Sequence, residues 1–89
     1  MQQASVLEKV VAEIAAAPHG VAALTLYALV STLEFERAGY LFKLAKLRDL
    51  SADQRRLAYG LMELMVENAN ASADWRSAKT QMDELVRAG

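Results

Sequence analysis

The chain has 89 residues, a net charge of −1 at neutral pH and no cysteine. Its length predicts a single domain over residues 1–89, and the lack of cysteine excludes a disulfide framework, a zinc–thiolate site and a thiol nucleophile. A hydrophobic content of 54%, rich in alanine and leucine, favours helix and indicates that a second subunit covers part of the apolar surface.

The first predicted helix covers residues 5–17. Ser5 and Glu8 have the spacing of a capping box, in which the serine hydroxyl accepts from a backbone amide and the glutamate reaches back. Apolar residues then recur at helical spacing. Pro18 and Gly20 end the helix.

The second predicted helix covers residues 21–49, which contain no proline. Gly39 weakens it by about 1 kcal/mol relative to alanine but need not break it. Because the helix is apolar on most of its circumference, it should be buried on most of its circumference. The other helices do not supply enough cover, so we expect a homodimer with this helix at its interface. The interface candidates are Leu26, Tyr27, Val30, Leu33 and Leu41.

The third and fourth predicted helices cover residues 52–69 and 73–88. Ser51 and Gln54 form a second capping box, and Ser72 caps the last helix, with Asp74 near its positive end. No segment alternates with a period of two, so no strand is expected. The predicted fold class is all-α, a small four-helix bundle with one long, largely apolar second helix, assembled as a dimer.

Glu34 is the residue that this pattern does not explain. Glu36 falls on the polar stripe of the second helix, and Glu34 lies about 160° away on the wheel, among apolar residues. An ionised carboxylate there must be paired, hydrogen-bonded or protonated. The favoured interpretation is a buried ion pair with Arg37. The alternatives are an exposed position, if the helix bends or stops near Gly39, and a functional carboxylate that binds metal or acts as a base.

Other chemistry finds little support in the sequence. A di-iron carboxylate bundle needs a Glu-x-x-His pair on each of two helices, but the only histidine is His19, in a Pro-His-Gly turn. No Gly-x-Ser-x-Gly elbow accompanies it, and the glycines are scattered singly. We therefore assign no catalytic, cofactor-binding or metal-binding residue and expect no cofactor.

Basic residues concentrate between positions 37 and 56, where six of them face two acidic residues, a net charge of +4. Such a segment is typically a solvated face, although it is also a candidate anion-binding corner. We call its members the basic corner: Lys43, Lys46, Arg48, Arg55 and Arg56, with Arg37 at its edge.

These patterns favour a protein-interaction or assembly module that acts as a homodimer and binds another protein. The alternative is a nucleic-acid-binding regulator that uses the basic corner, and the third hypothesis is a metal-binding or enzymatic bundle centred on Glu34. The apolar stretch from Val21 to Leu33 is shorter than the roughly 18–20 residues that span a bilayer. Glu13 also interrupts any signal-like region, so we expect a cytoplasmic protein with no membrane partner.

Overall fold

The computed structural model describes residues 5–34, 42 and 44–88. Every regular element in this part of the chain is helical, which confirms the all-α class. The α-helices are α1 (Val6–Ala16), α2 (Val21–Glu34), α3 (Ala52–Val66) and α4 (Ala73–Ala88). Two short 3₁₀ helices, η1 (Leu44–Asp49) and η2 (Ala69–Ala71), precede α3 and α4 respectively.

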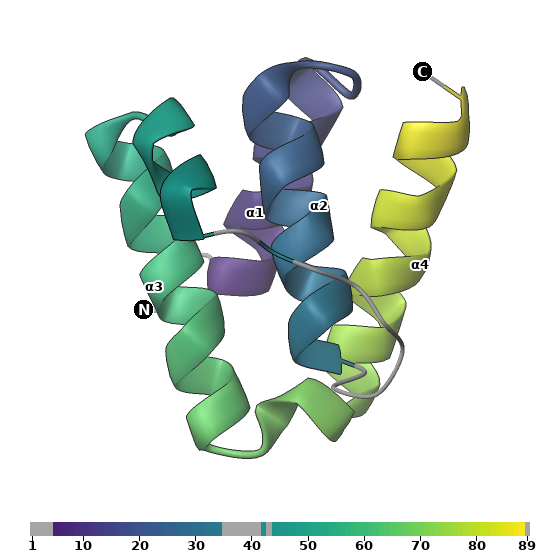
Figure 1. The fold of residues 1–89 in the computed structure, drawn as a ribbon. Helices are drawn as coiled ribbons and strands as arrows, with labels where there is room; N and C mark the ends of the chain where they lie inside the picture. The colour runs from purple at the N-terminus through teal and green to yellow at the C-terminus, as the bar shows by residue number, and fades with distance from the viewer. Residues whose placement is uncertain (1–4, 35–41, 43, 89) are drawn as a thin grey trace.

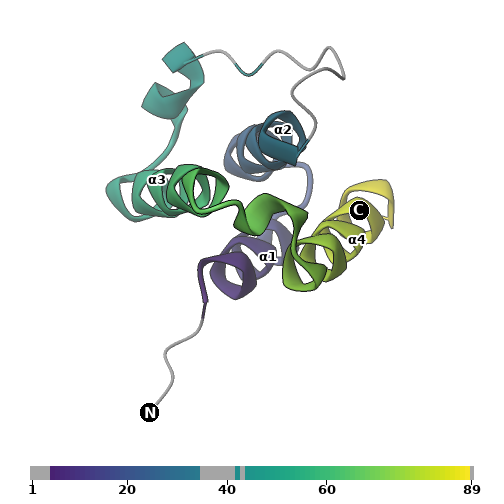
Figure 2. The same cartoon turned by 90° about the horizontal axis from the view of Figure 1, so that it is seen from below.

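The four α-helices form two parallel pairs (Figure 1). α1 and α4 run in one direction and lie side by side, whereas α2 and α3 run in the opposite direction. Seen along the bundle, α1 and α2 occupy the middle, with α3 on one flank and α4 on the other (Figure 2). α1 contacts all three other α-helices. Because α1 and α4 are parallel neighbours, their first turns lie at the same end of the molecule.

Local capping explains where the helices begin. The capping box of α3 is complete: Gln54 N–H donates to Ser51 Oγ at 3.2 Å, and Ser51 N–H donates to Gln54 Oε1 at 2.8 Å. In α1, Glu8 N–H donates to Ser5 Oγ at 3.1 Å, which is one of the two bonds expected of a capping box. Ser72 immediately precedes α4, and its hydroxyl accepts from the third backbone N–H of the helix, that of Trp75, at 3.1 Å.

The hydrophobic core draws on all four α-helices, and Trp75 of α4 is its largest fully buried side chain. Its large, fully buried members also include Val10 and Ile14 from α1, Leu26 and Val30 from α2, Leu61 from α3, and Met82 from α4. α2 is the central element, because it packs against α1, α3, α4, η1 and η2. Its apolar circumference is therefore covered largely by the chain's own helices.

The long second helix predicted over residues 21–49 is not seen as one continuous element. α2 covers Val21–Glu34, Phe42 lies outside any helix, and residues 44–49 form η1. The physical reason is the direction of the described helices. α2 and α3 are parallel (Figure 1), so one straight helix over residues 21–49 would carry the chain away from the start of α3. Instead, Leu50 is buried in the core beside the partly buried Leu47.

α1 and α3 approach each other closely at Gly60. A Cβ atom added to Gly60 would lie 2.9 Å from Val6 Cγ2 and 3.1 Å from Val6 Cγ1. The missing side chain therefore provides the space into which Val6 packs. This contact sets the spacing of the two helices at the start of α1.

Candidate functional site

An open groove of about 580 Å³ runs between the beginnings of α1 and α4. The two helices start at the same end and lie next to each other there, and the end of α3 and η2 close one side (Figures 1 and 2). Most of the side chains that form its wall are apolar or alanine: Val6, Leu7, Val11, Ala12, Leu64, Ala69 and Ala78. The groove thus exposes an apolar surface that belongs to the edge of the core.

Polar residues surround this apolar wall. They are Ser5, Glu8, Ser72, Asp74, Ser77 and Gln81. Ser5 and Ser72 already accept helix N–H groups, whereas Glu8 and Asp74 are exposed carboxylates in the first turns of α1 and α4. No ion pair to either carboxylate occurs among the described residues, and no described residue that lines the groove is basic. The rim of the groove is therefore acidic.

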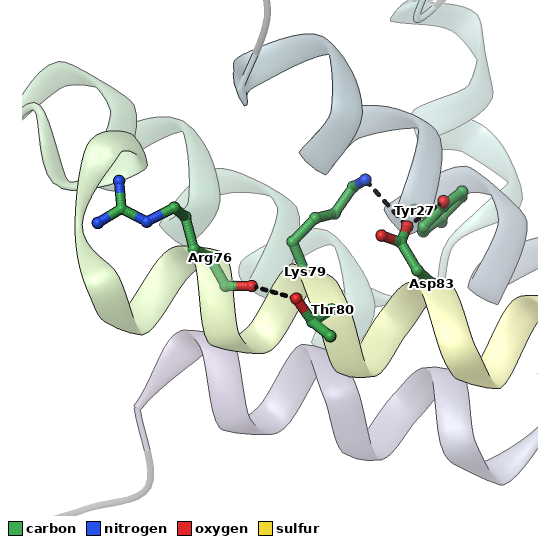
Figure 3. A network of polar contacts seen from close by, with 5 residues as sticks. All are labelled: Tyr27, Arg76, Lys79, Thr80 and Asp83. Carbon is green, nitrogen blue, oxygen red and sulfur yellow. Dashed lines mark hydrogen bonds and ion pairs between the residues drawn. The ribbon is translucent and has the colours of Figure 1, made fainter.

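A second group of polar side chains joins α2 to α4 (Figure 3). The Tyr27 hydroxyl donates a hydrogen bond to Asp83 Oδ1, and Lys79 Nζ lies 3.0 Å from the same oxygen. Lys79 Nζ also lies 5.0 Å from the centre of the Tyr27 ring, a distance at which a cation is attracted to the ring face. Lys79 and Asp83 are one helical turn apart, so α4 presents both groups to Tyr27.

The ionisation of this cluster follows from its contacts. Burial raises the pKa of Tyr27 above its ordinary value of 10.0, and the hydrogen bond to Asp83 raises it further, while Lys79 opposes both effects. Burial also disfavours the Asp83 carboxylate, but the hydrogen bonds from Tyr27 and Lys79 and the charge of Lys79 outweigh it and lower its pKa below 3.8. At neutral pH the cluster is a phenol, a carboxylate and an ammonium group that hold α2 against α4. We interpret it as a structural clamp.

Glu34 is the last residue of α2, but its side chain and Arg37 lie outside the described residues, so the expected ion pair stays a prediction. The helix end near Glu34 is capped by another residue. Asn70 Nδ2, on η2, donates to the carbonyl oxygen of Leu33 at 2.8 Å. This bond links the end of α2 to the connection between α3 and α4.

The basic corner is divided between two elements, and Lys43 lies outside the described residues. Lys46 and Arg48 are exposed on η1, with Lys46 Nζ 3.8 Å from an Asp49 carboxylate oxygen. Near the start of α3, Arg56 Nη1 lies 3.2 Å from Asp53 Oδ1, and Arg55 Nη1 donates to the Leu50 carbonyl at 3.3 Å. Intrachain acceptors therefore engage three of the four described cations.

The interface candidates on α2 fall into different environments. Leu26 and Val30 are fully buried within the chain's own core. Tyr27 and Leu33 are partly buried against that core, and Leu41 lies outside the described residues. The apolar side chains that α2 does expose are Val21, at 61%, and Leu24, at 44%.

His19 has a structural role in the turn between α1 and α2. Its ring Nε2 donates to the carbonyl oxygen of Val86 at 2.8 Å. The turn is thereby tied to the last turns of α4. The contact gives the polar ring at this position a hydrogen-bond partner within the fold.

In the described part of the chain, no group of three or more His, Asp or Glu side chains is arranged to hold a metal ion. No helix in the same ranges is long and apolar enough to cross a membrane. No known family model matches the chain, and no curated protein or solved structure matches it significantly.

Neither the groove nor the complete clamp can be predicted from local sequence patterns. The groove depends on α1 and α4 being parallel neighbours, which no local pattern specifies. Lys79 and Asp83 could have been noticed as an i, i+4 pair, but Tyr27 is 56 positions away from Asp83. In the sequence, Glu8 and Asp74 only indicate the starts of two helices. The fold brings both carboxylates to the rim of one groove.

Proposed function

We propose that this protein is a small helical interaction module whose binding surface is the groove between α1 and α4. The observation that carries the proposal is an open cavity of about 580 Å³ with an apolar wall and a polar rim. Binding sites commonly combine a concave apolar surface with a few polar groups that orient the ligand. Burial of a partner's apolar side chain in the groove would stabilise the complex by about 25 cal/mol for each Å² of apolar surface removed from water.

The polar side chains outside the groove, among the described residues, support an interaction module over an enzyme. The carboxylate, ammonium and phenol groups of the clamp are engaged with one another between α2 and α4. The groove, in contrast, carries carboxylates that make no intrachain ion pair among the described residues. Recognition through the groove therefore uses groups that the fold leaves available.

Selection from a randomised peptide library, with the whole chain as bait, tests the groove directly. Ala12 is exposed and lines the groove, so Ala12→Arg should fill it without disturbing the core. Ala15 is exposed on the same helix and does not line the groove, so Ala15→Arg is the matched control.

We expect the wild type and Ala15→Arg to enrich the same peptides and Ala12→Arg to lose them. Equal enrichment by Ala12→Arg, or no enrichment by the wild type, would contradict binding at the groove. Both variants should keep the wild-type helix signal in circular dichroism.

Self-association as a homodimer is part of the proposal, and its interface would use side chains that the chain's own core leaves accessible. Leu26 and Val30 cannot serve while the core is intact, because neither is accessible. Exposed apolar residues on α2, η1 and α3 are available instead: Val21, Leu24, Leu44, Tyr59 and Val66. Sedimentation at several protein concentrations separates a monomer from a self-associating chain.

A further inference from the structure

η1 presents an exposed apolar side chain, two cations and one carboxylate, Asp49, which lies 3.8 Å from Lys46 Nζ, so the net charge of its side chains is positive. Leu44 is 72% exposed, and Lys46 and Arg48 of the same short helix are also exposed. The element is anchored to the bundle, because Leu47 packs against the core and the chain continues into buried Leu50. The apolar and basic side chains of η1 are thus displayed on a supported element.

The groove has the complementary character. Its wall is formed by side chains such as Val6, Leu7 and Val11, and its rim carries Glu8 and Asp74. An apolar side chain flanked by cations would therefore find an apolar surface and two carboxylates. Opposite potentials of this kind guide association and set the register of the partners.

We infer that the groove of one copy receives η1 of a second copy, with Leu44 against the apolar wall and Lys46 and Arg48 beside Glu8 and Asp74. This inference rests on the proposed function, since it names the occupant of the same groove. η1 and the groove lie on opposite sides of the bundle, separated by α2 and α3 (Figure 2). One copy cannot close the contact on itself, so the contact is head-to-tail and builds a ring or an open chain in place of a closed two-fold homodimer.

Sedimentation velocity of the whole chain from about 10 µM to about 500 µM tests the assembly, because association follows protein concentration by mass action. The wild type should form larger species as concentration rises. Higher salt should shift it back toward monomer because it screens the exposed charges. Leu44→Ser should weaken association at least about tenfold, since it removes the buried anchor and alters no core residue.

A charge exchange tests the pairing itself. In the first variant, Glu8→Lys and Asp74→Lys give a basic groove beside a basic η1. In the second, Lys46→Glu and Arg48→Glu give an acidic η1 beside an acidic groove. Each variant alone should be monomeric, because its docking surfaces repel, and an equimolar mixture should recover the larger species. Glu63→Lys changes an exposed carboxylate of α3 that does not line the groove, and it should associate like the wild type.

A wild type that stays monomeric over the whole range would overturn the inference, as would a folded Leu44→Ser protein that assembles normally. If the charge variants unfold by circular dichroism, the Leu44→Ser result decides. The two proposals fail separately. A monomeric wild type that still enriches peptides sensitive to Ala12→Arg keeps the groove as a binding site and removes only the second copy as its occupant.

Discussion

Gly60→Ala tests whether α1 and α3 approach as closely as the structure shows. Alanine is preferred over glycine inside a helix by about 0.8–1.0 kcal/mol, so propensity alone favours the substitution. The new Cβ, however, would lie 2.9 Å from Val6 Cγ2 and 3.1 Å from Val6 Cγ1. Valine is branched at Cβ and strongly prefers one side-chain rotamer in a helix, so Val6 cannot simply turn away.

Overpacking of this kind costs about 1–3 kcal/mol. Subtracting the propensity gain leaves an expected loss of about 1 kcal/mol in the free energy of unfolding for Gly60→Ala. In a Val6→Ala background both methyl groups are absent. There, Gly60→Ala should stabilise by about 1 kcal/mol, close to the intrinsic preference. The substitution is therefore expected to change sign, with a coupling energy of about 2 kcal/mol between the two positions.

Urea denaturation of the wild type, the two single variants and the double variant measures this cycle. The four proteins should be compared at equal concentration, since self-association adds to apparent stability. The cost of Val6→Ala itself cancels in the coupling energy. If Gly60→Ala stabilised both backgrounds equally, α1 would not contact α3 at this point and the proposed helix spacing would be wrong.

Acid should weaken the clamp, because the pKa of Asp83 is lower in the folded chain than its ordinary value of 3.8: the stabilisation is complete above the unfolded-state pKa and is lost as pH falls through the folded-state value. Tyr27→Phe removes the donor to Asp83 and should cost about 1 kcal/mol at neutral pH and less in acid; urea titrations at both pH values measure this, and a pH-independent cost would contradict it. Asn70→Ala should also cost about 1 kcal/mol in the same assay, since it removes the 2.8 Å bond to the Leu33 carbonyl; no loss would mean that water replaces the amide. Asn68 has a φ of 64°, so Asn68→Ala should cost about 1–2 kcal/mol, whereas Asn68→Gly should be tolerated; equal midpoints for the two would count against the left-handed backbone.

The sequence by itself determined the helical class and most of the helix starts. Ser51, for example, bonds to a residue only three positions away. A cap of this kind is complete within one turn and does not depend on the rest of the fold. The break at Pro18 and Gly20 is equally local. These features were readable because their partners are near neighbours along the chain.

The tertiary structure decided which surfaces remain open. The apolar circumference of the second segment was compatible with a long helix covered by a second copy and also with a shorter helix surrounded by its own chain. The parallel run of α2 and α3 selects the shorter helix for the described residues, because one long straight helix would end far from the start of α3. The same arrangement places α1 beside α4, which creates the groove and brings Glu8 and Asp74 to one rim. Hydrophobic periodicity indicates that a face is buried. The hydrophobic effect is non-directional, so the pattern does not say which element covers that face. Only the packed helices specify it.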